Sequence, residues 1–120
     1  MKLPVAIAAL AALAQETRLS AYRLLVAEGR RGLAAGVIAD RLGVAPATLS
    51  FHLKELSRAG LIVARQDGRF IYYAAAFPAM TELLAYLTDN CCAGDGGDCA
   101  PAALVRRRST TRAARARTIT

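Results

Sequence analysis

Residues 33–61 carry the pattern that most narrows the folds open to this chain, because two short amphipathic segments meet there across a tight break. In both segments the apolar residues recur with the spacing of a helix that has one buried face. These residues are Val37, Ile38 and Leu42 in the first segment, and Leu49, Leu53, Leu56 and Leu61 in and just after the second. Gly43 supplies the turn, Pro46 suits a first helical position and Gly60 suits a helix end. The pattern predicts a helix, a short turn and a second helix.

Two runs of β-branched and aromatic residues follow directly, within residues 61–74, on either side of Asp67 and Gly68. An Asp-Gly pair favours the two-residue turn of a β-hairpin, because both central residues of that turn need positive φ. A hairpin placed directly after two such helices is a wing. The expected fold is therefore a winged helix-turn-helix.

Three further segments, residues 1–16, 17–28 and 77–90, have the apolar spacing of helices. Thr17 is the expected cap of the second segment, and Pro78 lies in the first turn of the third. The expected apolar faces are Leu3, Ile7, Leu10 and Ala14, then Leu19, Tyr22, Leu25 and Val26, then Met80, Leu83, Leu84 and Leu87. The fold class is thus mainly α with a β-hairpin wing, in the order α-α-α-α-β-β-α.

The outward side of the second helix and the hairpin carry hydrogen-bonding and cationic side chains suited to base edges and phosphates. The candidate DNA-contact residues are Thr48, Ser50, Phe51, His52, Lys54 and Arg58 in the helix, and Arg65 and Arg69 flanking the hairpin tip. A solvated polar face, or charges that only keep a hairpin tip soluble, would give the same pattern. Local charge favours nucleic acid, since residues 41–69 contain five basic and two acidic residues. The net charge of +7 is weaker evidence, because six of the 16 basic residues lie after residue 100.

The helices expected near the two ends of the folded part are more apolar than one small domain can bury. We expect both to lie in a homodimer interface, because a single module of this size buries too little surface for tight, specific binding to double-stranded operator DNA. The boundary expected from composition divides a winged helix-turn-helix and dimerisation domain, residues 1–92, from residues 93–120. That second part combines a Gly/Asp loop with a basic tail, expected to be disordered and to add salt-sensitive attraction to DNA.

The first 16 residues have some features of a secretory signal, namely one Lys, an apolar run and an Ala-Leu-Ala sequence. The run is mostly Ala and only moderately hydrophobic, which favours a packed helix. The chain also has no run near the roughly 20 apolar residues that a membrane span requires. A cytoplasmic protein without membrane contact is expected.

The run TLSFHLKELSRAGLIVARQDGRFIYY, residues 48–73, resembles the signature of the ArsR/SmtB family of winged-helix, metal-responsive repressors. The matching positions are Ser50, His52, Leu53, Leu56, Ala59, Gly60 and Leu61, with Asp67, Gly68 and Arg69 in the wing. The run QETRLSAYRLL is also similar, so the resemblance covers about residues 5–90. It implies a homodimeric cytoplasmic repressor that occupies its operator when empty and leaves when an inducer binds.

The only histidine, His52, borders the buried stripe of the second helix. One histidine without a second donor at ligand spacing is a poor metal site, and the resemblance places it in the DNA-reading helix. We interpret it as a packing or DNA-contact residue.

Three cysteines, Cys91, Cys92 and Cys99, lie together just after the last expected helix. An odd number, in a chain without a credible export signal, favours thiols over a disulfide framework. The metal sites usual in the family are missing, because there is no cysteine pair around residues 34–42 and no histidine or paired carboxylates in the last helix. Trivalent arsenic or antimony forms three bonds to sulfur, so three thiols suit it as the inducer. The arrangement also resembles family members that sense arsenite at the end of the last helix.

Other interpretations of the cysteines stay open. Asp95 and Asp98 could add oxygen ligands for zinc or cadmium, an organoarsenical could replace arsenite, and Cys91 or Cys92 could form a reversible disulfide with Cys99. Cysteines without a role in a flexible linker are a further interpretation. No organic cofactor is expected. An enzyme is disfavoured, because the chain has no Gly-rich phosphate loop or carboxylate cluster, although a cysteine nucleophile could act as in an arsenate reductase.

Overall fold

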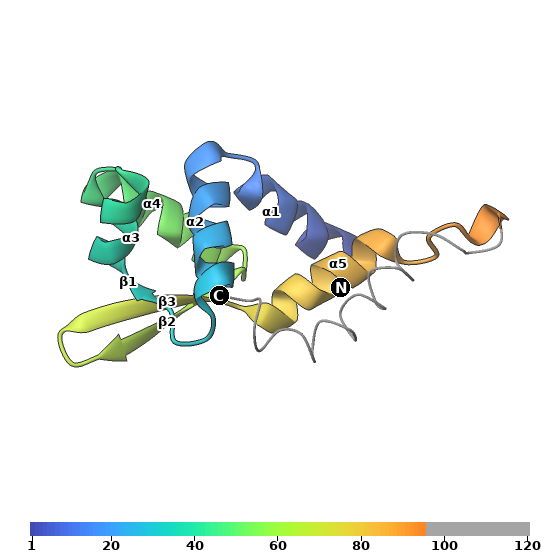
Figure 1. The fold of residues 1–120 in the computed structure, drawn as a ribbon. Coiled ribbons are helices and arrows are strands. Elements are labelled where there is room, and N and C mark those ends of the chain that lie inside the picture. Colours follow the sequence, from blue (N-terminus) through green and yellow to red (C-terminus); the bar gives the residue numbers. More distant parts are fainter. Residues whose placement is uncertain (96–120) are drawn as a thin grey trace. The chain divides into compact units, whose positions relative to one another are not determined.

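The elements of the structure follow the order predicted for a winged helix-turn-helix (Figure 1). They are α1 (Leu3–Leu13), α2 (Glu16–Glu28), β1 (Leu33–Ala34), α3 (Ala35–Leu42), α4 (Pro46–Arg58), β2 (Ile62–Asp67), β3 (Phe70–Ala75) and α5 (Phe77–Thr88), followed by a short 3-10 helix at Ala93–Asp95. The prediction of a mainly helical chain with a hairpin wing is confirmed, and β1 is an addition to it.

The computed structural model describes residues 1–95, so Cys99 and the basic tail predicted after it lie outside the described residues. Residues 1–86 form one compact unit, and a second unit begins at Leu87, within α5. Within the described part, no helix is both long and apolar enough to cross a membrane.

The residues predicted to begin and end the helices of the helix-turn-helix are confirmed. Pro46 is the first residue of α4, and Gly43 ends α3 with a left-handed φ of 67°. Gly60, with φ of 79°, follows the end of α4. The predicted stripe of α4 is fully buried, at Leu49, Leu53, Leu56 and, beyond the helix, Leu61. On α3, by contrast, Ile38 is buried but Val37 is exposed.

The three described strands form one antiparallel sheet in the order β1-β3-β2. Strand β1 was missed because two residues are too few to show an alternating pattern. Gly32, just before β1, allows the backbone there to lie close to β3. An added Cβ at this position would overlap the carbonyl oxygen of Tyr73 in β3. Gly32 also has φ of 72°, which disfavours any other residue there.

The hairpin turn lies one residue further along the chain than predicted. Asp67 pairs with Phe70, so the two turn residues are Gly68 and Arg69 rather than Asp67 and Gly68. Only the first of them has positive φ, 65° at Gly68, which is the requirement of a type II′ turn rather than of type I′. The side chain of Gln66 donates a hydrogen bond of 3.3 Å to the Gly68 carbonyl. Arg69 therefore lies at the tip itself.

The predictions for α2 were partly wrong. Its N-cap is Gln15, whose side-chain oxygen accepts a hydrogen bond of 2.9 Å from the Arg18 backbone N–H, rather than Thr17. Leu19 is exposed, whereas Tyr22 and Leu25 are buried. Burial raises the pKa of Tyr22, and its hydroxyl has no hydrogen-bond partner among the described residues.

The inward face of α1 is also different from the predicted one. The face packed into the core consists of small residues, Ala6, Ala9 and Ala12, because alanines allow α1 to lie close to its neighbours. The predicted stripe of large residues is exposed instead, with Leu3 at 60% and Ile7 at 57% of full exposure. In α5, Leu83 is buried and Met80 is half-buried, while Leu84 and Leu87 are exposed.

Replacing Gly32 by alanine tests the contact with β3. We expect Gly32→Ala to lower the free energy of unfolding by on the order of 3 kcal/mol, because it combines strained φ with a backbone overlap. Gly43→Ala is the matched control: its φ is similar, but a Cβ there meets no described atom within 4 Å, so about 1 kcal/mol is expected. Urea denaturation of both variants measures the difference, and equal losses would contradict the close approach at Gly32.

Candidate nucleic-acid interface

The outward face of α4 presents the polar and aromatic side chains predicted to contact DNA. Thr48, Ser50, Phe51 and Lys54 are all exposed, because the leucine stripe on the opposite side of the same helix is buried. Hydroxyl and ammonium groups on one helical face suit base edges and phosphate oxygens. The structure therefore brings these four predicted residues together.

His52 occupies the margin between this outward face and the core. Its Nδ1 lies 3.1 Å from Nη1 of Arg18 in α2. A guanidinium has only donors, so Nδ1 accepts this bond and the ring carries its proton on Nε2. Arg18 in turn donates from Nε to the carbonyl oxygen of Ala12, at 2.6 Å. His52 is thus tied to α1 and α2 through Arg18, which supports the packing role foreseen for it.

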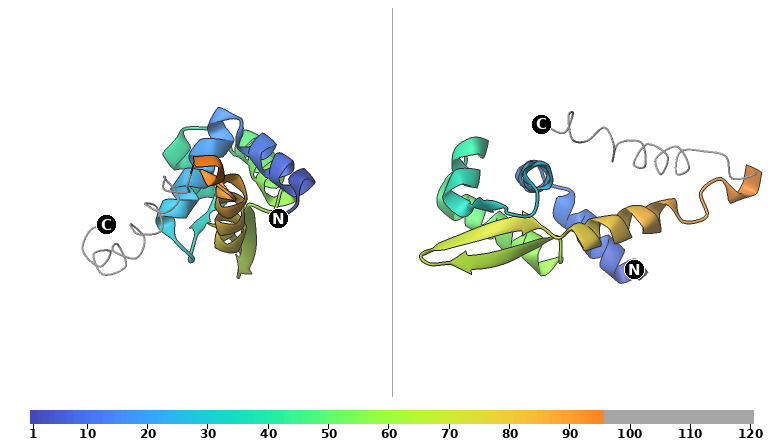
Figure 2. Two further views of the ribbon diagram at one scale, coloured as in Figure 1. Left: turned by 90° about the vertical axis from the view of Figure 1, so that its right-hand side faces the viewer. Right: turned by 60° about the horizontal axis from the view of Figure 1, so that its bottom comes forward.

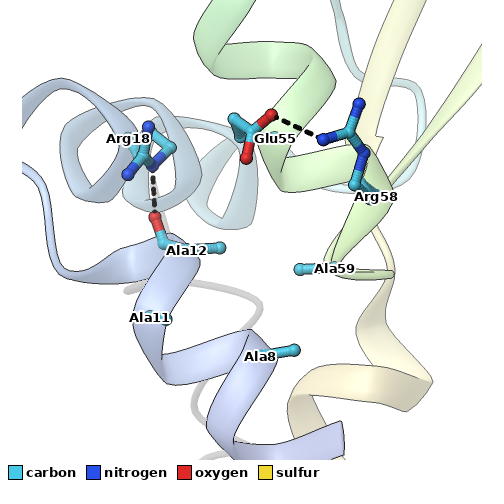
Figure 3. A pocket seen from close by; sticks show the side chains of 7 residues that line it. All are labelled: Ala8, Ala11, Ala12, Arg18, Glu55, Arg58 and Ala59. Carbon is cyan, nitrogen blue, oxygen red and sulfur yellow. Dashed lines mark hydrogen bonds and ion pairs between the residues drawn. The ribbon is translucent and has the colours of Figure 1, made fainter.

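Arg58 lies at the C-terminal end of α4, one turn beyond Lys54, and its side chain is 69% exposed. Its guanidinium pairs with Glu55 at 3.1 Å. Both residues line a pocket of about 280 Å³ between α4 and the alanine side of α1 (Figure 3). The pocket is lined by Ala8, Ala11, Ala12, Arg18, Glu55, Arg58 and Ala59. This position favours a role at the α1 side of α4 over a DNA contact for Arg58.

The β2–β3 hairpin projects from the helices, as Figure 1 and the right-hand view of Figure 2 show. Arg65 lies along the hairpin rather than at its tip: its Nη2 donates a 2.8 Å hydrogen bond to the carbonyl of Arg31. The same guanidinium stacks over the Tyr72 ring, 5.0 Å from its centroid. These contacts hold Arg65 against the side of the wing, at its pairing with Tyr72. Arg69, in the turn, is the cation at the exposed end.

Two of the three predicted cysteines lie in the described part of the second unit, and Cys92 is disulfide-bonded in the structure. The Sγ atoms of Cys91 and Cys92 are 3.6 Å apart, and both residues are half-buried. Asn90 and Cys92 have φ of 59° and 62°, the left-handed region that non-glycine residues rarely adopt. Within residues 1–95 no group of three or more Cys, His, Asp or Glu side chains is placed to hold a metal ion. The third predicted donor, Cys99, lies outside the described residues.

Arg18 is the residue of this region that sequence reasoning missed. Its hydrogen bond to His52 joins positions 34 residues apart, and no local pattern reports such a pairing. The only signal was that Arg18 falls within the QETRLSAYRLL run similar to the family.

Comparisons with known proteins agree with this geometry. A family model described as a helix-turn-helix domain matches residues 13–65. The nodulation protein NolR of Rhizobium meliloti is 34% identical over 80 residues, which cover 67% of this chain and 63% of NolR. The chain thus spans less than two thirds of the length of the first curated relatives that it matches.

Two solved structures extend the comparison. A possible transcriptional regulator for arsenical resistance is 30% identical, with a TM-score of 0.56 over 63% of this chain and 76% of that one. The homodimeric winged helix-turn-helix DNA-binding domain of Mb0332 from Mycobacterium bovis, a possible ArsR-family transcriptional regulator, is 29% identical. Its TM-score is 0.60 over 74% of this chain and 82% of that one.

Lys54 is exposed on the outward face of α4, whereas Arg58 pairs with Glu55, and this difference gives a test of the interface. We expect Lys54→Ala to weaken DNA binding across sequences and to lower the slope of log K against log salt by about 1, because one cation that neutralises a phosphate is removed. Arg58→Ala removes the same charge from the same helix, but should leave the slope unchanged because Glu55 already pairs with that guanidinium. Salt titrations by fluorescence anisotropy measure both slopes. Equal reductions in the two variants would show that Arg58 contacts phosphate as well.

Proposed function

Because the chain belongs to the ArsR family of winged helix-turn-helix transcriptional regulators, which bind DNA and are not enzymes, we propose that it is an inducible repressor. In this proposal the protein occupies its operator until trivalent arsenic or antimony binds the thiolates of Cys91, Cys92 and Cys99. The observation that carries the inducer assignment is the close pair of sulfur atoms at Cys91 and Cys92.

The separation of the two sulfur atoms suits binding to one central atom. Metal–sulfur bonds of about 2.3 Å to a tetrahedral centre place two sulfurs roughly 3.8 Å apart. The Sγ atoms of Cys91 and Cys92 are 3.6 Å apart, so both could bind one atom once the disulfide of Cys92 is reduced. The left-handed φ of Cys92 is also a local strain of the kind that gathers at binding sites.

The number of thiols favours a trivalent metalloid over the other inducers considered. Arsenic(III) and antimony(III) need three sulfur ligands, and Cys99 follows Cys92 by seven positions, close enough in the chain to supply the third. Zinc and cadmium prefer four ligands and would need another donor, for which Asp95 and Asp98 are candidates. The relatives do not decide the point, since one is named for nodulation and another for arsenical resistance. A methylated arsenical or a thiol redox switch would use the same cysteines.

A homodimer through the first and last helices is part of the proposal. The exposed residues of α1, Leu3, Ile7 and Leu10, follow the i, i+4, i+7 spacing of one helical face. Such a continuous apolar stripe on a helix is typical of an interface rather than of scattered surface residues. The winged helix-turn-helix domain of Mb0332 is homodimeric, which supports a dimer but does not identify the helices in its interface.

Coupling between the thiols and DNA would act through α5. Drawing Cys99 onto Cys91 and Cys92 would restrain the end of this helix, and a shift of α5 in the dimer interface would change the spacing of the two copies of α4. An allosteric coupling of about 1–3 kcal/mol corresponds to a loss of operator affinity of roughly 5- to 150-fold.

Titration of the complex of reduced protein and promoter DNA tests the inducer. We expect arsenite and antimonite at micromolar levels to lower fluorescence anisotropy, because three thiolates release the protein from its operator, whereas zinc and cadmium should not. Cys91→Ser and Cys92→Ser should bind the operator as tightly as the unmodified chain and no longer respond. Tight binding that ignores all four ions would exclude the metalloid site while leaving the DNA-binding function intact.

Substitution within the α1 stripe tests the dimer. We expect Ile7→Glu to shift the protein towards monomer and to weaken operator binding, because the charge would be buried at the interface. Val5→Glu is the control, since successive residues turn by 100° and Val5 lies nearly opposite Ile7 on the same helix. Sedimentation velocity distinguishes monomer from dimer for each variant. A fully dimeric Ile7→Glu protein would place the interface elsewhere.

A further inference from the structure

Phe51 is an unusual member of the exposed face of α4. Its side chain is 58% exposed, although it lies among hydroxyl and ammonium groups on a helix that already has a complete buried stripe. A single exposed apolar residue needs no explanation by itself. What distinguishes Phe51 is that its neighbours hold the ring in place.

The ring of Phe51 is the end of a chain of contacts that begins in α1. The rings of Phe51 and His52 pack edge to face, with centroids 5.4 Å apart and an interplanar angle of 65°. His52 accepts the 3.1 Å bond from Arg18. Arg18 in turn donates the 2.6 Å bond to the Ala12 carbonyl, which Figure 3 shows. Edge-to-face packing has a preferred geometry, so this chain limits the orientations open to the exposed ring. A fixed ring loses little conformational entropy on binding.

We propose that Phe51 is a base-reading residue that recognises the C5-methyl group of a thymine in the major groove of the operator. The inference rests on the DNA-binding function proposed for α4 and specifies what that helix reads. The residues Thr48, Ser50 and Lys54 around Phe51 supply polar contacts, and the phenyl ring supplies the largest apolar contact of this face.

Thymine is the base that fits a phenyl ring, for a chemical reason. A phenyl ring offers no hydrogen-bond donor or acceptor to the edges of guanine, adenine or cytosine. The thymine methyl is the apolar group that distinguishes an A·T pair in the major groove, and aromatic side chains contact it favourably. Phe51 also lies in the second turn of α4, the N-terminal part of the helix that reaches base edges in this type of motif.

Replacing thymine by uracil removes this methyl group alone. The experiment uses duplexes carrying the footprinted operator, in which each thymine is changed in turn to deoxyuridine at symmetric positions, with affinity measured by fluorescence anisotropy. At one position of each half-site, uracil should weaken binding by the unmodified protein about fourfold for each methyl group removed. Phe51→Ala should bind the thymine and uracil duplexes equally at that position.

Phe70→Ala is the matched control. Phe70 is the same residue type with the same 58% exposure, but it lies on the hairpin. This variant should keep the thymine-to-uracil ratio of the unmodified protein. The proposal is overturned if no uracil substitution weakens binding, or if Phe51→Ala retains the full ratio. Binding to the unsubstituted duplex distinguishes failure of the thymine contact from failure of the proposed DNA-binding function. A protein that does not bind this duplex would overturn DNA reading by α4 as a whole.

Arg18 is the positioning residue in this proposal, and Arg18→Lys tests that role. A lysine ammonium cannot present two N–H groups in the fixed geometry of a guanidinium, so it should not hold both Ala12 and His52. The thymine-to-uracil ratio should fall towards one while the salt dependence of binding stays the same, a change that general destabilisation would not cause. An unchanged ratio would overturn the positioning role of Arg18.

Discussion

Burial of the leucine stripe on α4 is the constraint on which the rest of this structure depends. Leu49, Leu53 and Leu56 are buried, and through them α4 packs against α1, α2, α3 and β2. Fully burying one such side chain contributes about 1.5–3 kcal/mol, so rotation of α4 about its axis would be costly. Because the buried face is fixed, the opposite face of the helix is presented to solvent in one orientation. The proposed DNA-reading surface is therefore a consequence of core packing.

The same packing separates residues that look alike in the sequence. Lys54 and Arg58 are four positions apart on one helix, yet Arg58 lies beside α1 and pairs with Glu55 while Lys54 is exposed on the outward face. In the hairpin, Arg65 is bound to the Arg31 carbonyl and only Arg69 occupies the tip. The guanidinium groups of Arg58 and Arg65 thus have partners within the chain, whereas Lys54 and Arg69 lie on the outward face and at the tip. A count of basic residues does not reveal this division.

The first helix shows how a small protein serves two surfaces with one element. Ala6, Ala9 and Ala12 let α1 approach the core closely, while Leu3 and Ile7 on another face stay exposed. The Ala12 carbonyl also receives the hydrogen bond of Arg18, which continues to His52 on α4. A proposed dimerisation helix is therefore linked to the proposed reading helix through Arg18 of α2. Such contacts offer a physical route by which assembly and DNA reading influence each other.

The sequence by itself determined the helices, the hairpin and their order, because helical periodicity, Pro46 and Gly60 are local signals. It also identified the outward residues of α4 and the cysteine group, since spacing along one chain segment is enough for both. Only the tertiary structure decided which face of α1 is buried, where β1 pairs, and that Arg18 holds His52. The turn at Gly68 and Arg69 likewise depends on the register of β2 against β3. These features come from contacts between residues distant in the chain, and no local periodicity encodes such contacts.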